Sequence, residues 1–420
     1  MKPAISSSYR WLVCALLFFA TTVNYIDRQV LSLLKPLLDE QLHWTNGQFG
    51  LVNAAFQGAY ALGLLGFGRL IDRVSLKFGY ALSITAWSFA AAGHALAVTL
   101  SGFLAARICL GLGEGGNFPA AIKAIALWFP QRERALATGL FNSGANIGAV
   151  VAPAVIPWIA LTWGWQSAFL AAGTAGLLWL TLWLPLYRAP RSGENPDPEA
   201  SMRESPPPDW LALCRSRAAW SFIIAKFLTD PVWWFFLIWL PDYFKQTRGL
   251  DLKHSWTHLV SIYLLVTVLS LVATWTTGRL ALFGWSVTRA RKTVMFSCAL
   301  AVVPILLAAH AGPWEAVFLI GLAGAAHQGW SANLYSTVSD LFPKSAIASV
   351  TGLGSMAGCL GGIAFPIITG QLLDRFAAKR DITGGYAALF SVCAAAYLVA
   401  FLLNHLLAPR FERGPESIGT

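Results

Sequence analysis

Apolar runs of about 20 residues recur along nearly the whole chain and are separated by short polar segments. A helix needs about 20 apolar residues to cross the hydrocarbon core of a bilayer, which is about 30 Å thick. The pattern therefore predicts an all-α membrane protein with twelve membrane-spanning helices. They are expected near residues 11–34, 48–70, 79–99, 101–128, 135–161, 166–187, 218–243, 256–278, 293–311, 314–341, 346–372 and 385–408.

The composition agrees with a membrane protein. Of the 420 residues, 56% are hydrophobic and only 12% are charged, whereas soluble domains carry about 25% charged residues. Little chain remains outside the predicted helices, so we expect no soluble catalytic domain, no enzymatic activity and no cofactor. Most of the six cysteines fall inside predicted helices without the spacing of metal ligands, so no metal site is expected.

The net charge of +10 could suggest a nucleic-acid partner, but its placement indicates otherwise. With the N-terminus inside, Lys and Arg are concentrated in the loops placed on the cytoplasmic side, as the positive-inside rule requires. We therefore expect both termini in the cytoplasm, a lipid bilayer as surroundings, and no nucleic-acid partner. The first apolar run is too long for a signal peptide and shows no small-residue cleavage site, so it is interpreted as a retained helix.

The chain divides into two similar halves. Its most polar stretch, 188–217, is rich in proline, which favours an extended linker, and it lies between two sets of six predicted helices. Phe129-Pro130 in the first half recurs in register as Phe342-Pro343 in the second. We expect a six-helix half at 1–187, a cytoplasmic linker, and a second six-helix half at 218–420. Parallel repeats of this kind carry their substrate site at the interface near the bilayer midplane.

Four ionisable side chains lie inside two predicted helices. Asp27 and Arg28 are in the first helix, and Arg107 and Glu114 share one face of the fourth, about 10 Å apart along its axis. Charges inside a bilayer are costly and rarely lack a function. A carboxylate that can take up a proton, beside a guanidinium that can hold an anion, predicts a proton-coupled anion carrier. Two permanent ion pairs that fix helix packing are the alternative.

The loop after the second predicted helix carries a family motif. Gly68-Arg-Leu-Ile-Asp72-Arg73-Val-Ser75-Leu-Lys77 resembles the Gly-x-Leu-x-Asp-Arg-x-Gly-x-(Arg/Lys) loop of the major facilitator superfamily, with Ser75 at the second glycine. The resemblance extends over essentially the whole chain and implies the twelve-helix fold of that superfamily. It also implies that Asp72 and Arg73 gate the inner side, and we expect a monomer to be functional.

Within that superfamily, the string Asn24-Tyr25-Ile26-Asp27-Arg28 resembles the signature of the anion:cation symporters. These proteins carry sugar-acid and other organic anions, generally with protons. The resemblance implies that Asp27 and Glu114 titrate and that Arg28 binds the substrate anion. It also implies that Arg107 is the counter-charge that the two acids share, and that Tyr60 is a hydrogen-bond partner. Asn117 lies three residues beyond Glu114, and it either contacts a substrate hydroxyl or bonds within the core.

The second half offers a further polar group. The repeat places His327 at the position of Glu114, with Gln328, Trp330 and Asn333 close to it in sequence. Polar side chains beside an aromatic face suit a carbohydrate, although a satisfied core histidine is the alternative. The string around these residues resembles that of hexuronate transporters.

The seventh predicted helix contains a Lys and an Asp one helical turn apart. Lys226 is either a second anion contact or the partner of Asp230 in a structural pair. Pro231, which follows directly, is expected to break or kink this helix.

Together these features predict a secondary active transporter. It would take up a sugar-acid anion, of the hexuronate class, with protons across the bacterial inner membrane by alternating access. An organic anion exchanger, or a symporter of another carboxylate such as an aldonate or glucarate, is the alternative. An intramembrane aspartyl protease is disfavoured, because Gly111-Leu-Gly113 is followed by Glu114 rather than by aspartate.

Overall fold

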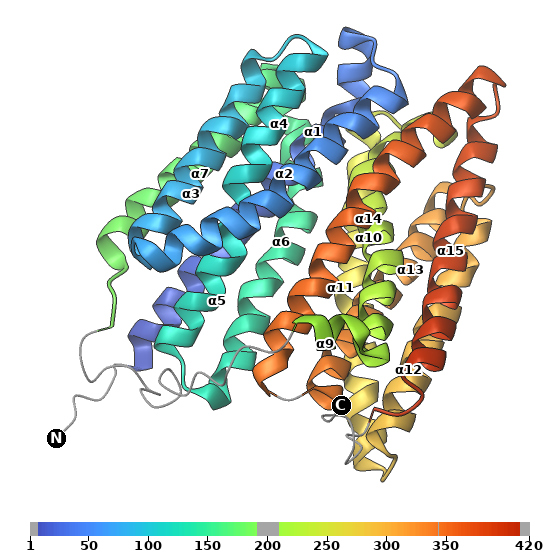
Figure 1. Ribbon diagram of the computed structural model, residues 1–420. Coiled ribbons are helices and arrows are strands. Elements are labelled where there is room, and N and C mark those ends of the chain that lie inside the picture. Colours follow the sequence, from blue (N-terminus) through green and yellow to red (C-terminus); the bar gives the residue numbers. More distant parts are fainter. Residues whose placement is uncertain (1–6, 191–209, 343, 412–420) are drawn as a thin grey trace. The chain divides into compact units, whose positions relative to one another are not determined.

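The computed structural model describes residues 7–190, 210–342 and 344–411, and every regular element in these ranges is a helix (Figure 1). In chain order the elements are α1 (Ser7–Leu42), α2 (Asn46–Arg73), α3 (Leu76–Gly93), η1 (His94–Leu96), α4 (Leu100–Glu114), α5 (Asn117–Trp128), α6 (Gln131–Trp163), α7 (Trp165–Leu186), α9 (Trp210–Arg215), α10 (Arg217–Arg248), α11 (Leu252–Leu282), α12 (Val287–Val302), η2 (Val303–Leu307), α13 (Pro313–Leu341), α14 (Lys344–Ala378) and α15 (Ile382–Leu407).

The helices agree with the predicted pattern. Each of the twelve predicted ranges falls on one or more of them, and nine helices of the described chain are long and apolar enough to cross a membrane. One range differs in detail, because 101–128 is divided into α4 and α5 by Gly115 and Gly116. These glycines donate to the carbonyls of Gly111 and Gly113 and so close the last turn of α4. Glu114 is therefore the last residue of a helix.

Polar side chains fix where several helices begin. Thr45 forms a capping box with Gln48 at the start of α2, and the Thr99 side chain accepts from the Gly102 amide at the start of α4. Such caps satisfy amide groups that have no partner within the helix. Between α6 and α7 the backbone turns at Gly164, whose φ of 86° is accessible chiefly to glycine.

The described chain forms two compact units. Unit 1 contains α1 to α7 together with Leu237–Lys245 of α10 and Leu250–Val260 around the start of α11. Unit 2 contains α9, α10 as far as Phe236, the short segment Gln246–Gly249, and the described chain from Ser261 onward. The boundaries 1–187, 188–217 and 218–420 stay a prediction; residues 191–209 of the predicted linker lie outside the described residues, and α9 falls within its range.

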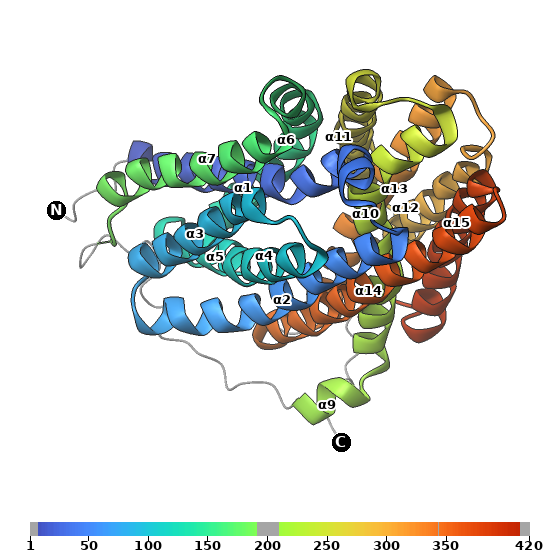
Figure 2. The same cartoon turned by 90° about the horizontal axis from the view of Figure 1, so that it is seen from above.

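In unit 1, α2 and α4 lie side by side in both views (Figures 1 and 2). The glycines of α4 permit this approach. A Cβ on Gly111 would lie 2.5 Å from the Phe56 carbonyl oxygen of α2. A Cβ on Gly113 would lie 2.6 Å from the backbone nitrogen of Trp87 in α3. Small residues at these positions let the backbones touch, as is common between membrane helices. They place Glu114 against the neighbouring helices.

In unit 2, α10 runs without interruption through Pro231, so a break there is not observed, and a kink there stays a prediction. Proline leaves the carbonyl four residues earlier without its helical donor. That carbonyl, of Phe227, lies against Gly361 of α14, where a Cβ would be only 2.6 Å from the oxygen. The absence of a side chain at Gly361 thus accommodates the irregular turn.

Replacing Gly113 by alanine should destabilise the protein, because the added methyl group has no space between α4 and α3. Overpacking of a core costs about 1–3 kcal/mol, which thermal unfolding of the purified protein in detergent would measure as a lower Tm. Gly66→Ala in α2 is the matched control, since a Cβ there would meet no atom of the described chain within 4 Å. Equal Tm values for the two variants would contradict the assigned close contact.

Candidate functional site

The four ionisable residues predicted in unit 1 come together between α1 and α4. Asp27, Arg28, Arg107 and Glu114 are 2%, 9%, 1% and 0% exposed. Arg28 Nε donates to Glu114 Oε2 at 2.5 Å, so the observed ion pair joins the two helices. The sequence grouped each acid with the arginine of its own helix, and the structure instead brings the acid of α4 to the arginine of α1.

The other acid and the other arginine are less completely bonded. Both carboxylate oxygens of Asp27, and Nε and one terminal nitrogen of Arg107, are buried without a hydrogen-bond partner among the described residues. Arg107 lies 5.4 Å from the centre of the Phe56 ring. Buried charges without hydrogen bonds cost several kcal/mol. This part of the cluster has the polar atoms that a proton and an anion would engage.

Aromatic rings surround Arg28. Its guanidinium carbon lies 5.1, 5.5 and 4.4 Å from the ring centres of Tyr25, Phe56 and Tyr60. Cation–π contacts of this kind stabilise a desolvated guanidinium without neutralising its charge. Tyr60 was predicted as a hydrogen-bond partner in the site, and the structure places its ring face against Arg28.

Asn117 opens α5 and has both polar groups engaged. Its side-chain oxygen accepts from the Tyr80 hydroxyl at 2.5 Å, and its amide donates to Thr21 Oγ1 at 3.3 Å. These bonds connect α1, α3 and α5, as expected for the alternative of core hydrogen bonding. A substrate contact for Asn117 stays a prediction.

In unit 2, Lys226 and Asp230 form an ion pair along one face of α10. Lys226 Nζ lies 2.6 Å from Asp230 Oδ2 and 4.4 Å from the centre of the Tyr335 ring on α13. The two side chains are 5% and 18% exposed. The lysine is therefore neutralised within its own helix in this structure.

His327 lies between two aromatic side chains. Its Nδ1 is 2.5 Å from the Tyr397 hydroxyl of α15, and its ring stacks on Trp233 of α10 with centres 5.4 Å apart and planes 5° apart. Trp330, one turn further along α13, packs edge-on against Tyr397 at 5.8 Å. The structure thus groups His327 and Trp330 around Tyr397.

The other two residues of α13 that were predicted to bind substrate are Gln328 and Asn333. Asn333 donates to the Gly329 carbonyl and accepts from the Thr277 hydroxyl of α11, both at 2.9 Å. Gln328 is half-buried. A substrate role for either residue stays a prediction.

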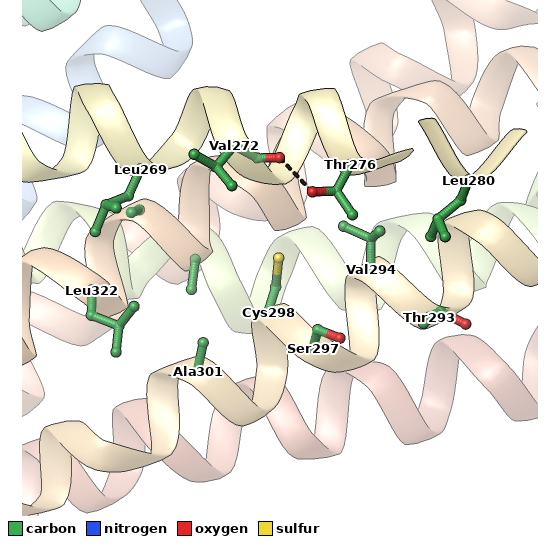
Figure 3. Close-up of a pocket in the computed structure, with 12 residues that line it drawn as sticks. Leu269, Val272, Thr276, Leu280, Thr293, Val294, Ser297, Cys298, Ala301 and Leu322 are labelled. Carbon is green, nitrogen blue, oxygen red and sulfur yellow. Dashed lines mark hydrogen bonds between the residues drawn. The ribbon is translucent and has the colours of Figure 1, made fainter. Parts of the chain in front are cut away.

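A separate cavity of about 290 Å³ in unit 2 is apolar (Figure 3). Leu269 and Val272 of α11 face Val294 and Cys298 of α12 across it. The hydroxyl of Thr276 is bonded to the Val272 carbonyl of its own helix at 2.7 Å. Walls of this kind offer little to a charged or hydroxylated ligand.

Comparison with known proteins identifies the family. The model of the Major Facilitator Superfamily matches residues 17–366, which is most of the chain. The chain belongs to the Major Facilitator Superfamily. This confirms the predicted fold class.

Relatives of this facilitator include a hexuronate transporter of Escherichia coli (strain K12), 29% identical over 94% of the chain and 93% of the relative. A protein of Bacillus subtilis (strain 168) named probable galactarate/D-glucarate transporter is 29% identical over 96% and 92%. These names confirm the resemblance inferred from the motifs. A crystal structure of a bacterial homolog of the human lysosomal transporter Spinster, inward-facing and occupied, shares the fold, with a TM-score of 0.80 at 17% identity over 98% of this chain and all of that one.

The superfamily loop of this facilitator lies between α2 and α3. Ser75, at the position of the second motif glycine, caps α3 by accepting from the Phe78 amide. Arg73 is exposed, and the side chain of Asp72 lies outside those that the structure describes. Lys123 of α5 donates to the Ile71 carbonyl at 3.1 Å and so contacts the end of α2. The gating roles of Asp72 and Arg73 stay predictions.

A third charged cluster in the facilitator was not predicted. Lys35 of α1 donates to Asp39 at 2.5 Å, to Asn46 at 3.0 Å and to Asp242 of α10 at 2.7 Å. Lys35 and Asp242 are 1% and 0% exposed. The spacing of Lys35 and Asp39, one helical turn apart, was visible in the sequence. Its pairing with a residue 207 positions later was not.

Lys35→Met should destabilise the facilitator, because it leaves the buried carboxylate of Asp242 without the ammonium. Removing one partner of a buried ion pair costs about 3–5 kcal/mol, and thermal unfolding in detergent would report the loss as a lower Tm. The double variant Lys35→Met/Asp242→Leu removes both charges and should recover part of that loss. A double variant no more stable than the single one would contradict the pairing.

Proposed function

We propose that this protein takes up a sugar-acid anion, of the hexuronate class, together with protons by alternating access across a bacterial inner membrane. The observation that carries the proposal is the buried cluster of unit 1. In it, an ion pair between Arg28 and Glu114 lies beside Asp27 and Arg107, whose hydrogen bonding is incomplete. The relative named for hexuronate transport supports this substrate class, and the one named for galactarate or D-glucarate transport supports sugar acids more broadly.

The charges of the cluster give a physical reason for coupling. With two carboxylates and two guanidinium groups ionised, the four side chains are neutral together. A substrate carboxylate adds one negative charge, which is costly in a buried site, and a proton on Asp27 or Glu114 restores neutrality. Anion and proton therefore favour each other's binding.

Protonation also frees the anion-binding group. A proton on Glu114 removes the negative charge that holds Arg28, and the guanidinium can then hold a substrate carboxylate through two parallel hydrogen bonds. Arg107 would serve as the counter-charge that the acids share. When the proton leaves, Glu114 competes again for Arg28 and promotes release of the substrate.

The remaining predicted residues fit supporting roles in this scheme. Tyr60 would keep Arg28 in place through its ring face, and Asp72 and Arg73 would stabilise one of the alternating states. The polar side chains of unit 2 suit the hydroxyl groups of a sugar acid. They are Lys226, His327, Gln328, Trp330 and Asn333.

Uptake into proteoliposomes tests the coupling. With purified protein, labelled glucuronate should accumulate inside when the outside is made acidic. A protonophore should abolish the accumulation, because it dissipates the proton gradient that drives uptake. Protein-free liposomes give the background. Glucuronate flux that ignores the proton gradient but supports counterflow would instead favour the exchanger. Competition by a panel of sugar acids would distinguish hexuronates from aldonates and glucarate.

Glu114→Gln should separate driven transport from exchange, because glutamine imitates the protonated acid but cannot release a proton. We expect accumulation in a proton gradient to fall at least about tenfold while substrate counterflow falls much less. Glu133→Gln is the matched control, since Glu133 pairs with Arg10 in unit 1 and is partly exposed. Equal loss of both activities in Glu114→Gln would indicate a structural role for this acid.

A further inference from the structure

Lys226 and Asp230 of unit 2 form an ion pair whose two charges cancel, and this bears on whether a charged or an uncharged group of a substrate can bind there. Lys226 is a buried ammonium, and Asp230 of the same helix contacts it at 2.6 Å. We propose that Asp230 is a specificity residue that makes the protein select monocarboxylate sugar acids over dicarboxylate ones. The inference rests on the proposed function and deepens it, because it assigns the substrate class from the charge of this pair.

Lys226 is the buried cation of unit 2 that could bind the second carboxylate of a dicarboxylate substrate. Among the described residues of this unit, the buried cationic side chains are Lys226 and Lys292. Lys292 is engaged elsewhere, with the Ala408 carbonyl at 2.7 Å and His405 at 3.0 Å. Lys226 instead faces α13, the helix that carries His327, with its Nζ 4.4 Å from the ring centre of Tyr335.

Asp230 is held firmly in its pairing position. Its carboxylate packs directly on Gly358 of α14, where a Cβ would collide with Oδ2. The one-turn spacing on α10 keeps its carboxylate within reach of Lys226. A carboxylate from outside would have to compete with Asp230, which already contacts Lys226 at 2.6 Å.

A neutral pair of this kind matches a hydroxyl group better than an anion. A hydroxyl can donate to Asp230 and accept from Lys226 at the same time. A second carboxylate can only accept, and it would meet the like charge of Asp230, which costs binding free energy. The stacked rings of Trp233 and His327 lie on the same helices and add a flat apolar surface beside the polar pair. The region therefore suits the uncharged end of a uronate or aldonate and disfavours an aldarate.

Competition in proteoliposomes tests this selectivity. Counterflow of labelled glucuronate is measured with unlabelled glucuronate or glucarate as competitor, at a pH where glucarate carries two charges. In the natural protein, glucarate should compete at least about tenfold less well than glucuronate. In Asp230→Asn, which keeps the side-chain shape but releases Lys226, the ratio should shift toward glucarate by about tenfold.

Two further variants identify the cause of the shift. Adding Lys226→Met to Asp230→Asn removes the freed ammonium, and the gain for glucarate should disappear. Asp340→Asn is the matched control, because it removes a carboxylate from another ion pair of unit 2, with Arg291, and should leave the ratio unchanged. A gain that persists without Lys226, or an equal gain in Asp340→Asn, would overturn the assignment.

If Asp230→Asn fails to fold, comparing glucarate and glucuronate transport by the natural protein still tests the proposed selectivity. Transport of glucarate as effective as that of glucuronate would overturn the specificity proposal and leave sugar-acid transport intact. Absence of transport of any sugar acid would overturn the proposed function instead. The two failures are therefore distinguishable.

Discussion

The ion pair between Arg28 and Glu114 is the interaction on which the charged part of unit 1 depends. It joins α1 to α4 at a point where Glu114 is fully buried and Arg28 is 9% exposed. A lone charge in that position would be expensive, so each helix stabilises the placement of the other. Asp27 and Arg107 are also buried in unit 1, and in the proposed mechanism the charge balance of the cluster changes when this pair opens. In that mechanism the transport chemistry and the packing of the first helices depend on the same contact.

The close approach of α4 to α2 and α3 relies on glycines at the points where the backbones touch. Gly111 and Gly113 bring the backbones together, and the chain turns at Gly115 directly after Glu114. The backbone of Glu114 is fixed by these close helix contacts, while its carboxylate is held by the Arg28 side chain. The glycines therefore help to position the carboxylate, even though they carry no chemistry themselves.

Much of the fold could be predicted from the sequence, because the length and apolarity of a membrane helix are local properties. The charged residues were also visible, since charges in apolar runs are rare. Their partners were not. Whether Glu114 meets Arg28 or Arg107 depends on how α1 and α4 are rotated about their axes, which no local pattern specifies. For the same reason Asn117 could not be assigned to Tyr80, nor Lys35 to Asp242. Pro231 shows the opposite case, in which a local rule allowed a break or a kink and the helix continues without a break.

The pairing of Lys35 with Asp242 has a consequence for biosynthesis. The two residues are 207 positions apart, and Leu237–Lys245 belongs to the same compact unit as α1. While the ribosome is still making the intervening helices, the ammonium of Lys35 has Asp39 and Asn46 as its hydrogen-bond partners. Because Asp242 is made long after Lys35, their ion pair can form only once this part of α10 has been synthesised. Completion of the first compact unit therefore requires a segment from the second half of the chain.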